Sequence, residues 1–313
     1  MQPFANAHPL SFASSIKSKL KRSFPALTNV YKLQAGLRAG HFPIVLDYPV
    51  SPKSRYGWGK PAHGMLHAQI AARTGEYLEL LKRLAPYENL LGAIPTETPA
   101  SAELPFWRNN WVMGLDAATL YAFPSVFHSK LYIEVGSGNS TKFVRRSIVD
   151  NHLGTRIVSI DPHPRAEIDA LCDEVIRMPL ETADLHVFAQ LEANDILMID
   201  NSHRCFQNSD VTVTFLDVLP RLNPGVLIYI DDIYLPYDYP QDWDWRYYSE
   251  QYLLATLLLA DKGARYEILF PGFFFSVIDE TAKKAAAEFW QRCGLGQFAS
   301  TTANGFWMRV RAG

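Results

Sequence analysis

The sequence predicts an α/β fold with a doubly wound, mainly parallel β-sheet. From residue 130 onward, short apolar runs alternate with helical patterns, as is typical of a parallel sheet covered by helices on both faces. The first apolar run breaks into a glycine turn, Gly136-Ser137-Gly138, and then enters a helix. Right-handed crossovers between successive strands give such a sheet its doubly wound topology. Ligands of these sheets bind beyond the carboxyl ends of the strands.

The expected elements follow one another with turn residues between them. Five strands are expected at Leu131–Ile133, Arg156–Ile160, Val175–Met178, Ile196–Ile199 and Val226–Ile230, with two later ones at Tyr266–Phe270 and Phe306–Val310. The helices between them are expected at Asn139 or Ser140 to Ile148, Pro164–Leu171, Leu185–Leu191, Val211–Leu222, Gln251–Ala260 and Thr281–Arg292. Turns such as Asn223-Pro224-Gly225 separate helix from strand.

The first part of the chain is predicted to be a helical and irregular extension, residues 1–105, followed by a sheet domain, residues 106–313. Phe12, Ile16, Leu20 and Phe24 recur every four residues among lysines and arginines, which predicts a basic amphipathic helix. Such a helix either docks on a protein surface, the favoured interpretation, or touches an anionic membrane. Further helices are expected at His63–Leu84, which ends at a proline, and at Phe106–Tyr121. The extension would cover a ligand pocket or form a contact between subunits.

Composition narrows the class of protein. The 313 residues carry a net charge of −2, which gives no electrostatic reason to expect nucleic acid as a partner. Three widely spaced cysteines argue against a disulfide framework and fit a reducing cytoplasm. No apolar run reaches the roughly 18 residues of a membrane span, and we expect no secretory signal. A cytoplasmic protein is expected.

Carboxylates follow the apolar strands repeatedly. Glu134, Asp161, Asp200 and the pair Asp231-Asp232 all stand at the carboxyl ends of expected strands. One such acid could be chance, but four of five strands with this feature indicate a site at that edge of the sheet.

The glycine turn and the acids beside it predict an adenosine-type ligand. Gly136 and Gly138 allow close approach of a ligand, although the third glycine of the dinucleotide motif is missing and a plain tight turn is the alternative. Asp161, about 25 residues further on, suits ribose hydroxyls, or else it caps a helix. Glu134 would repel a pyrophosphate and attract a positively charged group. These residues favour S-adenosylmethionine (SAM) over NAD.

Four motifs in this order, EVGSGNST, SIDPHP, DILMIDNSH and GVLIYIDDIYLPYDYP, resemble a class I SAM-dependent methyltransferase. More narrowly, the chain is similar to small-molecule O-methyltransferases of the macrocin, novobiocin and cephalosporin-hydroxylase-like type. The resemblance covers roughly residues 106–313. It implies a Rossmann-like seven-stranded sheet, mostly parallel with an antiparallel last strand that Phe306–Val310 could supply. It also implies that Glu134, Gly136, Ser137 and Gly138 meet the methionine part of the cofactor, with Asp161 on the ribose and Asp200 close by.

The acids after the fourth and fifth strands suggest a cation. Asp200, Asp231 and Asp232 would repel one another unless a positive charge lies among them, and oxygen ligands suit Mg²⁺. The resemblance implies a metal on these acids. Alternatively, one aspartate caps a helix and another meets the cofactor.

His203 is the candidate general base, with Asp200 beside it, because a histidine pKa lies near neutrality. A loop histidine bonded to a backbone carbonyl is the alternative. The ring-rich loop Tyr234–Tyr248 follows the fifth strand and should roof the site. Its rings would stack on an acceptor or pack the N-terminal helices onto the domain.

The expected function is a SAM-dependent methyl transfer to the hydroxyl of a small molecule, such as a sugar, polyketide, phenol or glycan, with Mg²⁺ as a second expected cofactor. A homo-oligomer is a further expectation. The alternatives are an NAD-dependent oxidoreductase on a similar sheet and a non-catalytic SAM-binding scaffold.

Overall fold

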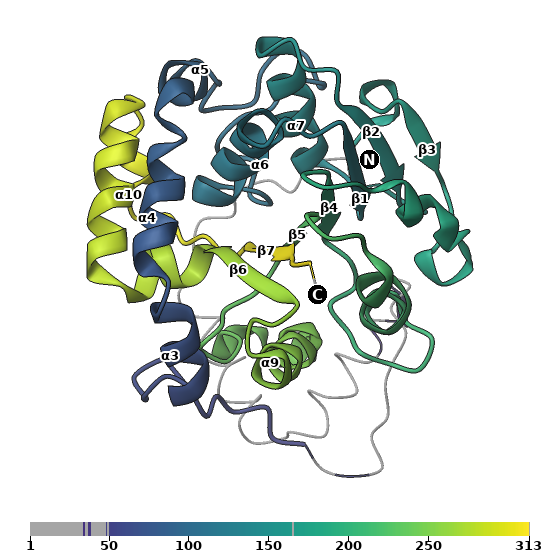
Figure 1. The fold of residues 1–313 in the computed structure, drawn as a ribbon, viewed down its shortest axis with the longest axis vertical. Helices are drawn as coiled ribbons and strands as arrows, with labels where there is room; N and C mark the ends of the chain where they lie inside the picture. The colour runs from purple at the N-terminus through teal and green to yellow at the C-terminus, as the bar shows by residue number, and fades with distance from the viewer. Residues whose placement is uncertain (1–33, 35–36, 39–47, 49, 165, 313) are drawn as a thin grey trace. The chain divides into compact units, whose positions relative to one another are not determined.

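A single mixed sheet forms the centre of the computed structural model, which describes residues 34, 37–38, 48, 50–164 and 166–312. The strand order is β3-β2-β1-β4-β5-β7-β6 (Figure 1). β1 pairs in parallel with both β2 and β4, so the direction of winding reverses between β1 and β4. β7 is antiparallel to both of its neighbours, β5 and β6. The predicted doubly wound sheet with an antiparallel last strand is confirmed.

The strands lie where the apolar runs predicted them, with small shifts at their ends. They are β1 (Leu131–Val135), β2 (Arg156–Ile160), β3 (Glu174–Ile176), β4 (Ile196–Ile199), β5 (Leu227–Ile230), β6 (Tyr266–Pro271) and β7 (Phe306–Val310). The central strands β1, β4 and β5 are buried along their whole length. This burial on both faces explains why their sequences are continuously apolar.

Helices flank the sheet and fill the connections. The α-helices are α3 (Gly64–Ala71), α4 (Thr74–Lys82), α5 (Glu88–Gly92), α6 (Gly114–Val126), α7 (Asn139–Asp150), α8 (Asp210–Val213), α9 (Glu250–Asp261) and α10 (Glu280–Arg292). α6 packs on α7, and α4 lies between β6 and α10 (Figure 1). α3 packs against α9. α9 comes after β5 in the chain and lies on the side of the sheet opposite α6 and α7 (Figure 1).

Three predicted helices differ from the observed ones. The helix expected over His63–Leu84 is two helices, because the backbone at Arg73 leaves helical geometry (φ −117°, ψ 14°) and its side chain reaches Glu267 of β6. The helix expected from Phe106 begins only at Gly114, since the Asn109 side chain holds a turn by accepting from the backbone of Trp111 and Val112.

The third difference concerns the segment after Pro164. Only Asp169–Leu171 is helical there, as a short 3₁₀ turn. The later segments expected to be helical are so, although Leu185–Gln190 is a 3₁₀ helix. Thr214–Val218, which follows α8 directly, is a π-helix.

Only part of the predicted N-terminal extension lies within the described residues. The amphipathic helix expected over Phe12–Phe24 lies outside the described residues. Residues 52–313 form one compact unit, and the predicted domain boundary near residue 105 stays a prediction. None of the helices in the described part of the chain has the length and apolar character needed to cross a membrane.

Candidate functional site

The turn after β1 requires glycine at its first position. Gly136 has a φ of +82°, a left-handed backbone conformation that residues other than glycine rarely adopt. A Cβ atom there would lie 1.7 Å from the carbonyl oxygen of Asp200. The turn after β1 therefore packs directly on the end of β4. This contact brings the glycine turn and Asp200 together, as the sequence predicted.

Glu134 lies beneath the turn, fully buried at the end of β1. Its carboxylate accepts hydrogen bonds from the hydroxyl groups of Ser140 and Thr141, the latter at 2.6 Å. Burial raises its pKa to about 8, against the lowering effect of these two bonds, and the nearby charges of Asp200 and Asp161 add to the rise. Glu134 thus fastens the start of α7 to the sheet.

A cavity of about 280 Å³ opens at the glycine turn, and we call it the cofactor cavity. Its walls are Val135, Gly136, Ser137, Ile160, Asp161, Pro162, His163, Pro179, Leu180, Glu181, Asp200, Asn201 and Asp210. Asp161 accepts backbone hydrogen bonds from Ser137 and His163, each at 2.7 Å. The cavity therefore brings together Gly136, Ser137, Asp161 and Asp200. Glu134 and Gly138 do not line it.

His203 sits in a buried cluster of carboxylates beside that cavity. Its Nε2 lies 3.2 Å from Oδ1 of Asp200 and 3.5 Å from Oδ2 of Asp232. Its Nδ1 lies 2.9 Å from Oε2 of Glu250, and its ring packs on Tyr248 with the ring centres 4.7 Å apart. The side chain is 2% exposed. Both ring nitrogens therefore face carboxylates.

The charges of this cluster decide the state of the imidazole. Burial alone would lower the pKa of His203, but the hydrogen bonds to Asp200 and Glu250 and the charge of Asp232 raise it well above its ordinary value. The protonated form of His203 is therefore favoured. The roles predicted for His203 and Asp200 stay predictions, and the geometry joins the two residues into one unit.

The expected Mg²⁺ site finds no support in this arrangement. In the described part of the chain, no group of three or more His, Cys, Asp or Glu side chains could hold a metal ion. The positive charge between Asp200 and Asp232 comes from His203. Asp231 accepts a hydrogen bond from the Tyr229 hydroxyl at 2.7 Å, and burial raises its pKa well above the ordinary value. These residues do not fit a magnesium ion.

Some residues of the site carried no signal in the sequence. Glu250 is buried and accepts a hydrogen bond from Asn201 at 3.0 Å, but an acid in the first turn of a helix is common. Asp116, on α6, accepts from the backbone of Asn304 and Gly305 next to the end of β5. Burial raises its pKa to about 7. Only the tertiary fold brings these groups to the site.

Comparison with known proteins matches part of the sheet domain to a methyltransferase family model. A family model described as "Methyltransferase domain" matches residues 133–233. Among curated proteins, none matches the sequence significantly. The solved structure of the Podospora anserina methyltransferase PaMTH1, bound to S-adenosylhomocysteine (SAH), is 15% identical with a TM-score of 0.39, and the match covers 82% of this chain and 100% of that one.

Two further structures are plantazolicin methyltransferases. BpumL in complex with SAH is 13% identical with a TM-score of 0.38, and BamL in complex with SAH and a triazolic desmethylPZN analog is 12% identical with a TM-score of 0.39. Each match covers 79% of this chain and 94% of the other. At TM-scores below 0.5, these likenesses identify neither the ligand nor the acceptor of this chain.

The narrower resemblance to sugar-type enzymes stays a prediction. The broader resemblance is confirmed: residues 133–233 carry a methyltransferase domain, and the chain has the Rossmann-like fold of class I SAM-dependent methyltransferases.

Proposed function

We propose that the chain transfers a methyl group from SAM to a hydroxyl group of a small molecule. The observation that carries this proposal is the double position of Asp200. It lines the cofactor cavity, and its Oδ1 lies 3.2 Å from Nε2 of His203. A hydroxyl oxygen that accepts a methyl group must lose its proton, so a proton-accepting pair beside the donor cavity favours O-methylation.

The residues of the cofactor cavity suit SAM, which supplies an electrophilic methyl group when bound. Gly136 and Ser137 present backbone to the ligand, and Gly138 starts α7 behind them. Asp161 keeps lone pairs for ribose hydroxyls, since each of its oxygens accepts one backbone hydrogen bond.

The charge of the cavity favours the same ligand. Asp161 and Asp200 line it, whereas Glu134, buried just beneath with a pKa raised to about 8, carries little charge at pH 7. A cationic ligand gains from the carboxylates of Asp161 and Asp200, whereas a pyrophosphate would be repelled. The alternative of an NAD-dependent oxidoreductase therefore gains no support.

The Asp200–His203 pair would take the proton of the acceptor hydroxyl. The methyl group would pass from the sulfur of SAM to the acceptor oxygen with release of SAH, and the hydroxyl proton would pass to the Asp200 carboxylate. The raised pKa of His203 favours its protonated form, so the pair acts as a coupled unit rather than as a free imidazole base. Glu250 fixes the ring orientation through Nδ1. Proximity and orientation of the reactants supply the remaining acceleration.

No metal enters this proposal. The imidazolium of His203 offsets part of the negative charge of Asp200 and Asp232. A divalent cation in the same place would have to displace a buried, hydrogen-bonded cation of the chain itself.

The test is the affinity of the full chain for SAH, measured by isothermal titration calorimetry. Asp161→Ala should weaken SAH binding by about tenfold to a hundredfold, since hydrogen bonds to charged groups contribute roughly 1.5–3 kcal/mol. Asp217→Ala is the matched control, because that carboxylate is 44% exposed on the surface. If Asp161→Ala and wild type bind SAH with equal affinity, the assignment of this cavity to the cofactor is refuted. A chain that binds SAH but methylates no hydroxyl compound would instead be a SAM-binding scaffold.

A further inference from the structure

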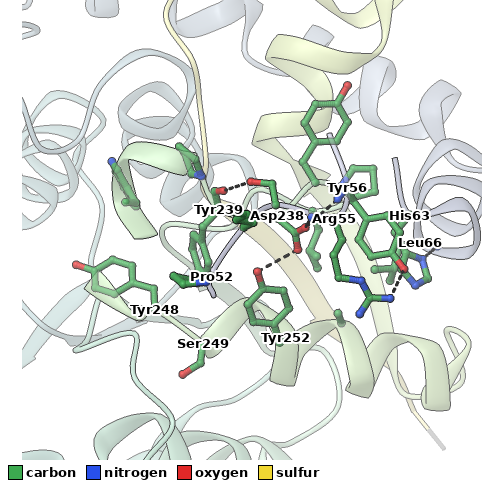
Figure 2. A pocket seen from close by; sticks show the side chains of 18 of the residues that line it. Pro52, Arg55, Tyr56, His63, Leu66, Asp238, Tyr239, Tyr248, Ser249 and Tyr252 are labelled. Atoms are coloured by element: carbon green, nitrogen blue, oxygen red, sulfur yellow. Dashed lines mark hydrogen bonds between the residues drawn. The ribbon is translucent and has the colours of Figure 1, made fainter. Parts of the chain in front are cut away.

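A second, larger cavity lies against the loop after β5. It has a volume of about 650 Å³ and is bounded by that loop, by the start of α9 and by residues 52–56 (Figure 2). Seven aromatic residues line it: Tyr56, Tyr237, Tyr239, Trp243, Tyr247, Tyr248 and Tyr252. We call it the tyrosine cavity. Its volume falls within the range of sites that hold drug-sized ligands.

The choice of aromatic residue is selective. The chain has 18 phenylalanines and 15 tyrosines, yet the lining includes six tyrosines and no phenylalanine. Phe273 packs behind the wall, against Tyr234 and Tyr237. Tyrosine offers an apolar ring face and a hydroxyl at its edge. A wholly apolar ligand would make no use of those hydroxyl groups.

The interior offers no unpaired charge. The one buried carboxylate of the lining is Asp238. Its Oδ2 accepts from the backbone N–H groups of Arg55 and Tyr56, and its Oδ1 accepts from the Tyr252 hydroxyl at 3.0 Å (Figure 2). Lys53, Arg55 and Asp244 also line the cavity but are exposed to solvent. A charged group on a ligand that enters deeper than these three residues would therefore lose water without gaining a partner.

The segment before α3 completes the wall. Trp58 donates from Nε1 to the carbonyl of Asp238 at 2.9 Å, and the His63 N–H donates to the carbonyl of Pro236 at 3.0 Å. Ser54 donates to the carbonyl of Tyr239. These bonds hold the wall together, so the cavity is a built feature of the fold.

Residues that line the tyrosine cavity contact His203 of the proposed proton-accepting pair. The ring of Tyr248 packs on His203, and the Ser249 N–H donates to the His203 carbonyl at 2.8 Å. His203 in turn contacts Asp200, which lines the cofactor cavity. His203 therefore contacts the linings of both cavities.

We propose that the tyrosine cavity binds the methyl acceptor, and that this acceptor is an uncharged ring compound carrying several hydroxyl groups. This assignment rests on the proposed function. Ring faces of the ligand contact the tyrosine rings, and its hydroxyl groups bond to the tyrosine hydroxyls. A saturated sugar ring and a polyphenol share this chemistry.

The experiment measures binding of three uncharged probes, maltose, phenyl β-glucoside and catechin, to the SAH-loaded full chain by calorimetry. At least one should bind, which also distinguishes a sugar from a phenol. Phenyl β-glucuronide, the carboxylate counterpart of the glucoside, should bind at least about tenfold more weakly than the best probe. No binding by any uncharged probe, or tighter binding of the glucuronide, would overturn the assignment.

Two variants on the same 3₁₀ turn, Gln241–Arg246, locate the binding. Trp243→Ala should weaken the best probe by about tenfold or more, because it removes a lining ring. Trp245→Ala should leave it unchanged, because that ring is 64% exposed and does not line the cavity. If Trp243→Ala fails to fold, Tyr252→Phe replaces it and should weaken binding. Equal affinities throughout would refute the site. Failure of the wild-type chain to bind SAH would instead refute the proposed function.

Discussion

His203 illustrates how surroundings change what a residue type can do. From the sequence it is a loop histidine with a pKa near neutrality, the usual choice for a base. In the fold it is buried, and both ring nitrogens face carboxylates. Its pKa is raised by the hydrogen bond to Asp200, three residues away, and also by Glu250 and Asp232, which lie far from it in sequence. The residue could be predicted, but its charge could not.

Gly136 gives the first prediction at this scale. Gly136→Ala places a Cβ against the Asp200 carbonyl and strains a positive φ, so the free energy of unfolding should fall by roughly 2–4 kcal/mol. Urea denaturation measures this change. Gly154→Ala is the matched control, since nothing lies within 4 Å of its Cβ position. A Gly136→Ala chain as stable as the Gly154→Ala chain would show that the turn does not pack on β4 as described.

Glu134 makes stability depend on pH. The ordinary pKa is 4.5, and burial raises that of Glu134 to about 8. Between these values the folded chain keeps a proton that the unfolded chain releases, so the free energy of unfolding falls as the pH rises through this window. Glu134→Gln lacks this contribution. Relative to the variant, wild type should therefore lose roughly 1–3 kcal/mol between pH 5 and pH 8.

Urea denaturation at both pH values tests this expectation. Glu79→Gln serves as the control, because that carboxylate is 71% exposed and pairs with Lys82. A difference between wild type and Glu134→Gln that is the same at pH 5 and pH 8 would mean that Glu134 is ionised in the folded chain throughout.

At the scale of elements, periodicity predicted the strands better than the helices. β2, β4 and β7 begin and end at the expected residues, and most residues of each strand are apolar and buried. The break between α3 and α4 was missed, since it depends on a contact of Arg73 with a strand almost 200 residues away. The late start of α6 depends on the side chain of Asn109. The spacing of apolar residues along a helix gives no sign of such a contact.

The first turn of α9 gives a prediction at this scale. Glu250 is 0% exposed and bonds to His203 and Asn201, so Glu250→Gln should lower the free energy of unfolding by roughly 2–4 kcal/mol by leaving the imidazolium less compensated. Glu280→Gln, in the first turn of α10, should have little effect because that side chain is 84% exposed. Denaturant titration at pH 7 compares the two. Equal stability would mean that α9 does not anchor His203.

At the scale of the molecule, motifs and cavities differ in how far sequence reveals them. The cofactor cavity is built mainly from residues that directly follow strands, so its position could be predicted from the order of strands and acids. The tyrosine cavity could not, because Arg55 and Asp238 are 183 residues apart in sequence. The loop Tyr234–Tyr248 was recognised as ring-rich, but its partner wall before α3 follows no pattern.

The central claim is that the cavity beside Gly136 and Asp161 binds SAM rather than a pyrophosphate cofactor. Thermal denaturation of the full chain with SAH and, separately, with NADH tests it most directly. At a ligand concentration about a hundredfold above the dissociation constant, binding adds roughly 2.7 kcal/mol. SAH should then raise the Tm by about 5 °C or more, while NADH leaves it within about 1 °C. A rise with NADH and none with SAH would contradict the account.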